Sequence, residues 1–313
     1  SFTVQHYGQP AIEPSAYRLR ITGLVNRPIE LSLAELKKRR RLEQVVGFEC
    51  SGNNNARGNP LVGNARWACT SLSRLLKECG LKPTGREAVF FGADKGSEEV
   101  SHGGSTQKVE QRFGRSLAID DATRPEVLIA YEVNGEPLPL VHGAPVRLVV
   151  PGWYGVANVK WLEQVHIMDR RFMGKFMARE YVTLGGDKLA SDIAWNETSV
   201  SRMQLKSMVA RVTRFGSSCK LLGFALNDGT PLKAVEISID GGAWRPASLE
   251  KSNTTYSWKL FRYLWEGAQA GEHTITSRAI DIHGNIQPTE AELESKKTRW
   301  ENNGQYVRKI VIS

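Results

Sequence analysis

The stretch VEISIDGG, residues 235–242, joins an alternating apolar and polar run to a glycine-rich turn. Alternation with a period of two is typical of a strand with one buried face, and Asp-Gly-Gly is the chemistry of a tight hairpin. Comparable runs recur through the rest of the chain, so we predict an all-β sandwich from about Lys206 onward. The strands expected there cover residues 234–239, 257–260, 272–281 and 307–312.

The half of the chain before Lys206 mixes two periodicities. Short apolar runs predict strands, and the stretches 31–38 and 72–81 predict helices. The segment 184–200 contains two adjacent glycines and few large apolar residues, which favours a linker. We therefore expect an α+β protein, with a mixed α/β domain over 1–186 followed by an all-β domain over 187–313. Strands of the first domain are expected at 18–24, 44–49, 89–92, 127–133 and 146–150.

Composition excludes several classes of protein. The 313 residues are 41% hydrophobic and 24% charged, as in an ordinary globular protein and unlike a disordered or fibrous one. No apolar run approaches the roughly 20 residues of a membrane helix, so no membrane span is expected. The chain begins at Ser1 without a basic stretch followed by an apolar one, so we expect a targeting peptide to be absent or removed.

The net charge of +9 and the pI near 9.4 indicate attraction to anions. The cluster KKRRR, residues 37–41, follows a predicted helix, and cations are favoured at helix C-termini. It also lacks the interleaved aromatic residues of a nucleic-acid-binding surface. We interpret it as a solvated helix end and expect no nucleic-acid partner.

Cys50 lies at the end of a predicted strand in the loop FECSGN, residues 48–53. None of the cysteines forms a CxxC pair, which excludes zinc ribbons, thioredoxin-like motifs and c-type haem attachment. A thiolate in such a loop is a ligand for a soft or high-valent metal or a nucleophile, and the alternative is a buried inert cysteine. The four cysteines are Cys50, Cys69, Cys79 and Cys219.

Several motifs follow this loop in a specific order and spacing, and together they resemble the sulfite oxidase family. They are CSGN (50–53), GNARW (63–67), AYEVNGEPLP (130–139), HGAPVR (142–147), VPGWYG (150–155) and VKWL (159–162). The segments LKS (205–207), VEISIDGG (235–242) and RAID (278–281) are similar to the immunoglobulin-like dimerisation domain of that family. The resemblance thus covers nearly the whole chain and implies a molybdenum–molybdopterin cofactor.

The resemblance assigns roles to individual positions. Cys50 matches the cysteine that ligates molybdenum, and Tyr181 matches the active-site tyrosine. A buried phosphate needs charge-assisted donors, which arginine and lysine provide. The cofactor-binding positions implied in this way are Val4, Gln5, His6, Cys50, Asp94, His142, Arg147, Asn158, Val159 and Lys160.

The positions that would bind a sulfite anion depart from the family. Three arginines are expected there, and this chain has Val4, Asn55 and Val307 instead. Removing the partner of a buried anion costs several kcal/mol. The loss of all three arginines would therefore leave no conventional sulfite pocket. Either Arg57 or Arg308 substitutes from a shifted position, or the substrate is a less charged sulfur compound or a sulfane group on a carrier protein.

The reaction that the resemblance implies is oxygen-atom transfer, most simply oxidation of a small sulfur compound. A reductase of nitrate or of a sulfoxide on the same fold is the first alternative, and a metal-free binding protein is the second. Because no haem motif is visible, the electrons are expected to leave to an external acceptor such as a c-type cytochrome. A homodimer formed through residues after about Lys206, and a periplasmic location after export, are the remaining implications.

Overall fold

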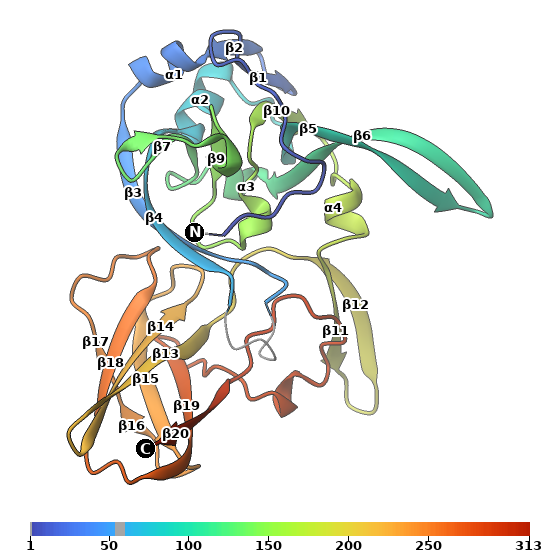
Figure 1. Ribbon diagram of the computed structural model, residues 1–313. Helices are drawn as coiled ribbons and strands as arrows, with labels where there is room; N and C mark the ends of the chain where they lie inside the picture. The colour runs from blue at the N-terminus through green and yellow to red at the C-terminus, as the bar shows by residue number, and fades with distance from the viewer. Residues whose placement is uncertain (1, 54–59) are drawn as a thin grey trace. The chain divides into compact units, whose positions relative to one another are not determined.

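The computed structural model describes residues 2–53 and 60–313. The chain divides into two compact units, drawn in Figure 1. The first unit comprises Ser1–Gln44, Ala65–Val150 and Val156–Tyr181, and the second comprises Val45–Asn64, Pro151–Gly155 and Val182–Ser313. Two short segments from the first half of the sequence thus belong to the second unit, and one of them carries Cys50.

The main sheet of the first unit is built from β1 (Arg18–Gly23), β2 (Ile29–Ser32), β5 (Glu87–His102), β6 (Ser105–Ala118) and β10 (Leu162–Met168). Its strand order is β2-β1-β10-β5-β6. Strands β1 and β10 are parallel, and the other neighbours are antiparallel. The strands expected over 18–24 and 89–92 are confirmed as β1 and part of β5.

A second sheet is built from β3 (Leu42–Glu49), β4 (Val62–Ser71), β7 (Leu128–Val133), β8 (Glu136–Pro137) and β9 (Arg147–Val149). Its order is β3-β4-β7-β8, with β9 beside β7. The strands expected over 44–49, 127–133 and 146–150 are confirmed here. Two candidate site residues take their place from this sheet, because Cys50 follows the last residue of β3 and Arg147 is the first residue of β9.

The helices are short: α1 (Leu33–Lys38), α2 (Leu72–Cys79), α3 (Ile119–Ala122) and α4 (Lys175–Ala178). A capping box of Ser32 and Glu35 begins α1, two residues later than expected because Ile29–Ser32 pairs with β1 as strand β2. The basic cluster ends this helix as interpreted, with Arg39 paired to Glu78 and Arg41 paired to Glu132. In the described residues, no helix is long and apolar enough to cross a membrane.

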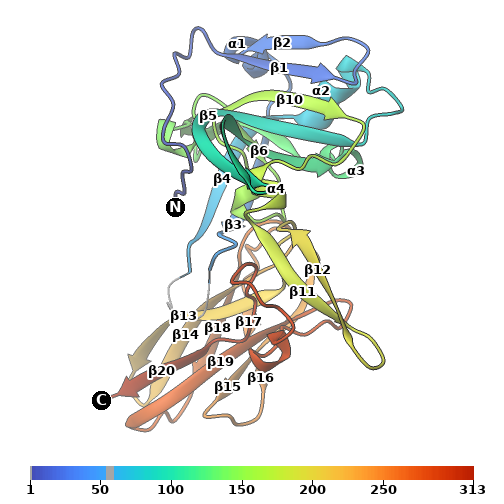
Figure 2. The same cartoon turned by 90° about the vertical axis from the view of Figure 1, so that its right-hand side faces the viewer.

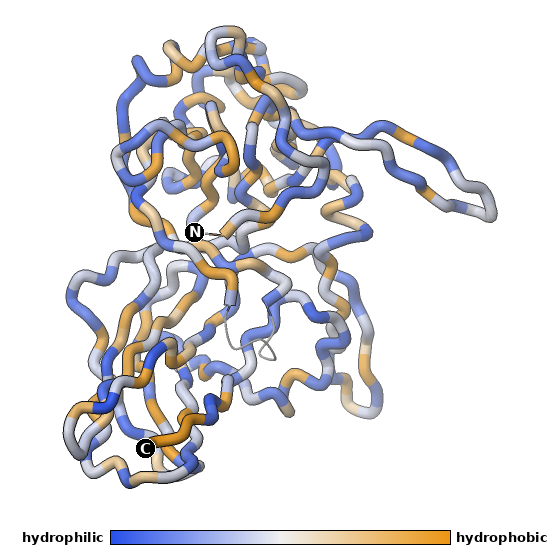
Figure 3. The backbone as a smooth tube through the Cα atoms, in the orientation of Figure 1, coloured by the Kyte–Doolittle hydropathy of each residue, from blue (hydrophilic) through white to orange (hydrophobic). Residues whose placement is uncertain are grey.

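Strands β5 and β6 are much longer than the sequence indicated. Beyond Gly96 they pair only with each other and form a two-stranded ribbon, which Figure 3 shows to be largely hydrophilic. The register between the two strands shifts between Phe91 and Lys95. Asp94 lies in this irregularity, and such bulges re-aim a side chain that would otherwise follow the strand.

The second unit contains two four-stranded antiparallel sheets, whose strands are drawn as arrows in Figure 2. The first consists of β13 (Lys206–Phe215), β14 (Ser218–Leu226), β17 (Ser248–Leu249) and β18 (Lys259–Trp265). The second consists of β15 (Leu232–Ile239), β16 (Arg245–Pro246), β19 (Gly271–Asp281) and β20 (Val307–Ile312). Both sheets contribute to one core, in which Leu221 and Phe261 meet Val235 and Ile275. The strands expected over 234–239, 272–281 and 307–312 are present, and the one expected at 257–260 begins at Lys259.

One expectation for the second unit was wrong. The segment 184–200 is no linker but a hairpin of β11 (Val182–Lys188) and β12 (Ile193–Ser199). Its glycines made it look unstructured, yet Gly186 lies opposite Trp195 and leaves room for the indole ring. The unit also contains a 3-10 turn, Ala291–Leu293, after which the Lys297 N–H donates to the Leu184 carbonyl.

The units also divide at a different place from the boundary expected after residue 186. The structure divides between Tyr181 and Val182. A boundary after residue 186 would cut through β11, which is hydrogen-bonded to β12 along its whole length. The roles assigned to the two domains remain predictions.

Candidate cofactor-binding site

Three basic side chains gather at the edge of the first unit where β9 begins. Arg147 is buried, and its guanidinium donates to the carbonyls of His142 at 2.9 Å and Asn158 at 3.0 Å. The same guanidinium lies 5.0 Å from the centre of the Trp67 ring. Arg147 therefore braces the two loops that carry His142 and Lys160.

Lys160 is held close to the loop of His142. Its ammonium donates to the Val141 carbonyl at 3.2 Å and lies 4.1 Å from the centre of the Trp161 ring. Gly143 has a φ of +105°, and a Cβ added to it would lie 2.9 Å from the Lys160 Cβ. Only glycine fits this backbone without strain, so the approach of the two loops depends on it.

The basic groups of this site disfavour one another's charged forms, which lowers the pKa values of Lys160 and His142. Burial lowers the pKa of Lys160 to about 8, and the charge of Arg147 adds to this effect. Burial also lowers the pKa of His142, again with contributions from Arg147 and Lys160. The pKa of Arg147 falls to about 9 through burial. A group of cations that disfavour one another's charge is relieved by an anion, and a phosphate dianion relieves it most.

The negative charge of Asp94 raises the pKa of Lys160 and so opposes the lowering caused by burial and Arg147. Its side chain is only 4% exposed, and Oδ1 has no hydrogen-bond partner among the described residues. Burial raises the pKa of Asp94 to about 6, while Lys160 and Arg112 oppose the shift. The neighbouring Ala93 N–H donates to the Trp161 carbonyl at 2.8 Å, which ties the bulge of β5 to the Lys160 loop. Oδ1 of Asp94 is thus able to accept a hydrogen bond from a ligand.

Asn158 and Val159 belong to the frame of this site. The amide oxygen of Asn158 accepts the Val150 N–H at 2.7 Å, and the Val159 carbonyl accepts the Leu148 N–H at 2.8 Å. Both residues are buried. The resemblance placed them beside the cofactor, and the structure shows that they fix the loop from which Lys160 projects.

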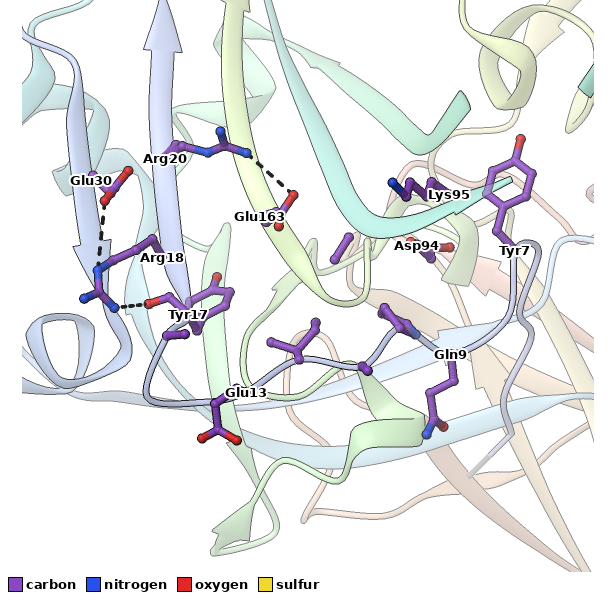
Figure 4. Close-up of a pocket in the computed structure, with 15 residues that line it drawn as sticks. Tyr7, Gln9, Glu13, Tyr17, Arg18, Arg20, Glu30, Asp94, Lys95 and Glu163 are labelled. Atoms are coloured by element: carbon purple, nitrogen blue, oxygen red, sulfur yellow. Dashed lines mark hydrogen bonds and ion pairs between the residues drawn. The ribbon is translucent and has the colours of Figure 1, made fainter. Parts of the chain in front are cut away.

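A cavity of about 680 Å³ opens on one side of Asp94, shown in Figure 4. Its far end is lined by Arg18 and Arg20, which pair with Glu30 and Glu163. The basic residues His142, Arg147 and Lys160 are not among the residues that line it. We therefore place the candidate site at the basic residues and Asp94, because the electrostatics converge there and the two arginines of the cavity each have a carboxylate partner.

His6 and Tyr181 meet elsewhere in the first unit. The Tyr181 hydroxyl lies 3.2 Å from His6 Nε2, and the imidazole stacks on Phe113 with a centroid distance of 5.1 Å. Burial lowers the pKa of His6, with Lys175 and Lys160 adding to the effect and Glu180 opposing it. Tyr181 is buried and has a φ of +56°, which is rare for a bulky residue and is typical of functional sites.

The Cys50 turn, residues 50–53, is the candidate ligand loop of the second unit. The Cys50 N–H donates to the Leu61 carbonyl at 2.9 Å, and the Cys50 carbonyl accepts the Asn53 N–H at 3.1 Å. The side chain of Asn53 bonds both the N–H and the carbonyl of Leu61. Burial raises the pKa of the Cys50 thiol, Glu49 adds to the effect, and Arg299 opposes it.

A buried ion pair stands directly before this cysteine. The Lys206 ammonium lies 2.8 Å from Glu49 Oε1, and the two side chains are 2% and 1% exposed. Lys206 also donates to the Asn302 carbonyl at 2.8 Å, and Asn53 donates to the same oxygen of Glu49 at 3.3 Å. The Cys50 turn is therefore attached to the first residue of β13.

With this geometry described, comparison with known proteins is informative. Residues 6–176, more than half of the chain, match the family model of the oxidoreductase molybdopterin-binding domain. The chain belongs to this family, that of the sulfite oxidases. Its members are oxidoreductases, and their cofactor is molybdenum bound to molybdopterin.

Relatives and a solved structure agree with the family match. Mitochondrial sulfite oxidase of Rattus norvegicus is 29% identical over 92% of this chain and 56% of that protein. NADH nitrate reductase of Ulva prolifera is 33% identical over 92% of this chain and 37% of that protein. The structure of sulfane dehydrogenase SoxCD from Paracoccus pantotrophus matches with a TM-score of 0.83 and 25% identity, over 99% of this chain and 82% of that one. The chain thus spans little more than half the length of the rat protein.

The residues of the first unit fit the cofactor of the family. A phosphate requires cations that have no ion pair of their own, and Lys160 has none among the described residues. The amino groups of a pterin require an acceptor, which Oδ1 of Asp94 supplies. In the described part of the chain, no group of three metal-ligating side chains occurs. The resemblance implies Cys50 alone as a protein ligand of the molybdenum, so a group of three ligating side chains is not required.

The structure describes some of the positions expected to bind a sulfite anion. Val4 is 39% exposed in the N-terminal segment, and Val307 is 51% exposed on β20. Gln5 is exposed as well. Arg308 donates to the Val209 carbonyl at 2.8 Å, so at least one of its donors is already engaged in the sandwich. Asn55 and Arg57 lie outside the described residues.

Sequence reasoning did not find every residue near Cys50. The ion pair of Glu49 and Lys206 was not expected, because its members are far apart in the sequence. Trp300 was also missed: a Cβ on Gly52 would lie 3.2 Å from its ring and 3.9 Å from the Cys50 sulfur. Arg299 lies 4.5 Å from the centre of that ring. No motif marks Arg299 or Trp300, so only the structure reveals them.

Proposed function

We propose that the protein is a molybdenum-dependent oxidoreductase that transfers an oxygen atom to the sulfur of a small compound. The observation that carries this proposal is the crowding of Arg147, Lys160 and the imidazole of His142 beside a carboxylate whose Oδ1 has no hydrogen-bond partner among the described residues, in a family whose cofactor carries a phosphate and a pterin. The bound cofactor supplies the two-electron redox chemistry, and the chain supplies position, charge and protons. Metal and pterin analysis tests this, and about one of each per chain is expected.

Each residue of the candidate site has a defined task in this proposal. Lys160 and His142 bind the phosphate, and Arg147 holds their loops while adding positive charge. Asp94 accepts hydrogen bonds from the pterin. Cys50 provides the thiolate ligand, which the turn around it presents in a fixed orientation.

Tyr181 and His6 form the proton-handling pair. Because its pKa is lowered, His6 is a neutral imidazole at pH 7, and Nε2 accepts a hydrogen bond from the Tyr181 hydroxyl in the tautomer that carries its proton on Nδ1. This arrangement holds the hydroxyl hydrogen in one direction. In the alternative tautomer the hydroxyl turns outward and donates to substrate, so a proton shift on His6 reorients Tyr181.

The substrate is expected to carry less negative charge than sulfite. The resemblance matches Val4 and Val307 to positions where the family has arginines for the anion, and an anion without such partners pays an uncompensated desolvation penalty. Steady-state assay with sulfite, other sulfur compounds, nitrate and sulfoxides tests this. A kcat/KM for sulfite above about 10⁶ M⁻¹s⁻¹ would show that Arg57 or another cation serves the anion. In that case Arg57→Ala raises KM sharply, and otherwise it changes little.

The acceptor of the electrons is proposed to be a c-type cytochrome. The chain has no CxxCH motif, so a haem would have to lie on another protein or segment. Reduction of cytochrome c by substrate-reduced enzyme, followed by absorbance, tests the proposal. Reduction of ferricyanide but of no cytochrome would oppose it.

We also propose that the second unit is an immunoglobulin-like dimerisation domain. Its two sheets share one core, and the outer strand β20 exposes Val307 and Val311 beside Lys309. Exposed valines on an edge strand are a surface that proteins usually cover. A dimer in light scattering at micromolar concentration supports this, and a monomer opposes it.

A further inference from the structure

The strongest unexplained feature is the buried ion pair beside the candidate ligand. Glu49 precedes Cys50 directly, and its partner Lys206 is the first residue of β13. Both side chains are almost inaccessible to solvent. Burying two charges costs so much desolvation that apolar side chains of similar size are often as good for stability. The pair is therefore poorly explained as a device for folding alone.

The contacts of the pair show what it holds. Glu49 Oε1 receives both the Lys206 ammonium and the Asn53 amide, while the ammonium donates further to the Asn302 carbonyl. From the other side, the Glu301 N–H donates to the Ser51 carbonyl at 2.7 Å. The bonds from Lys206 and Asn53 to Glu49, and the bond from Glu301 to Ser51, hold the Cys50 turn or the residue before it. The bond from Lys206 to Asn302 fixes the ammonium to the 301–302 segment.

The pair also balances charge. Glu49 alone would place a negative charge next to a thiolate, and like charges in a buried place oppose each other strongly. Lys206 cancels that charge at 2.8 Å. Glu49 Oε2 has no partner among the described residues, so Lys206 carries most of the compensation. Lys296 is the other lysine nearby, and its ammonium is engaged with the Glu301 carbonyl at 2.7 Å.

We propose that Lys206 is a positioning and charge-compensating residue for the metal ligand, acting on Cys50 through Glu49. Lys206 makes no contact with Cys50 itself. It fixes the carboxylate that anchors the Cys50 turn and offsets the negative charge of that carboxylate near the sulfur. The inference rests on the proposed function in one respect, namely that Cys50 ligates the molybdenum.

The test compares four variants of the cofactor-loaded protein. Lys206→Met removes the positive charge, Glu49→Gln removes the negative charge, the double variant removes both, and Lys206→Arg keeps the charge. Lys233→Met, at an exposed lysine of β15, is the matched control. The measurements are molybdenum content, kcat and KM, melting temperature, and the one-electron reduction potential of the molybdenum by redox titration.

Charge compensation predicts opposite shifts. Lys206→Met lowers the potential and Glu49→Gln raises it, each by a threefold to tenfold change in the one-electron equilibrium, which is about 30–60 mV. The double variant and Lys206→Arg return close to the wild-type potential, and Lys233→Met does not change it. In Lys206→Met kcat falls while KM stays within about twofold, because the ligand and not substrate binding is disturbed.

A purely structural pair gives a different result. Equal potentials in all variants that retain metal would overturn the inference, and so would single variants that shift in the same direction. If Lys206→Met fails to fold or to retain metal, the rise of the potential in Glu49→Gln decides, since there the Lys206 ammonium keeps two oxygen acceptors, the Asn302 carbonyl and the amide oxygen at position 49. Wild-type protein without molybdenum would refute the proposed function, and this inference with it, whereas normal metal with unshifted potentials refutes this inference alone.

Discussion

In the first unit, Lys160, Arg147 and His142 crowd together with Asp94 as the opposing charge, whereas in the second unit Glu49 and Lys206 neutralise each other beside Cys50. The first arrangement is electrostatically incomplete, and the second is complete. Each arrangement suits the role proposed for it. The uncompensated positive charge of the first unit favours binding of an anionic group. The compensated ion pair of the second unit leaves little net charge beside the proposed ligand.

The largest expected effect tests the second unit. Cys50→Ser should lower kcat by at least about 10³-fold, because the thiolate is replaced by a much harder oxygen ligand. The fold should survive, since the bonds described for Cys50 within the turn use its backbone. Circular dichroism, molybdenum content and turnover check this, with Cys79→Ala in α2 as the control. Full turnover with unchanged molybdenum would remove Cys50 from the metal site.

The next effect tests the incomplete charge of the first unit. Lys160→Met should weaken retention of molybdopterin by about 30-fold to several thousandfold, because truncating one partner of a buried charge pair costs about 2–5 kcal/mol. Pterin fluorescence after dialysis measures the loss. Lys108→Met on the exposed ribbon removes the same charge from the same unit and should retain cofactor as wild type does. Equal retention by both variants would contradict the assignment of the phosphate.

Asp94 offers a test of pH dependence. Its folded pKa of about 6 lies above the ordinary value of 3.8, so between these pH values the native state binds more protons than the unfolded state. Stability then falls as pH rises from about 4 to above 6, by up to about 3 kcal/mol. In cofactor-free protein, Asp94→Asn should therefore be more stable than wild type at pH 8 and equal to it at pH 4. Melting curves at both pH values measure this, and a difference that does not depend on pH would contradict it.

The smallest effect concerns the contact of the two loops. Gly143→Ala should cost about 2 kcal/mol, because alanine is strained at positive φ and its Cβ would press on Lys160. Gly135 has a φ of +88° and nothing within 4 Å of an added Cβ, so Gly135→Ala should cost only about 1 kcal/mol. Thermal unfolding compares the two. Equal losses would mean that the close approach to Lys160 is not important.

Sequence predicted the folded elements where one face is buried. The run 235–242 alternates because β15 packs one face on the shared core, and β1 alternates as well, whereas β3 and β7 were predicted from short apolar runs that are largely buried. The ribbon of β5 and β6 was not foreseen beyond Gly92, because residues outside a core need no apolar alternation. The hairpin of β11 and β12 was mistaken for a linker for the same reason, with most of β12 exposed.

The candidate site was predictable only where motifs mark it. His142, Arg147 and Lys160 lie within one short stretch, and the structure brings them into one electrostatic group. The pairing of Glu49 with Lys206 joins residues 157 positions apart, and although both lie in quoted motifs, nothing in the sequence links the two. Asp94 was placed only loosely by sequence, because its role depends on a bulge in β5. Long-range partners and bulges are set by tertiary packing, which local patterns do not contain.

The hydrogen bonds between the Asn53 side chain and the backbone of Leu61 have a consequence for the candidate ligand. Together with the bond from the Cys50 N–H to the Leu61 carbonyl, they fasten both ends of the Cys50 turn to the one residue that leads into β4. The main chain of the cysteine is therefore held by an immediate neighbour at the start of a strand, and its position is fixed locally.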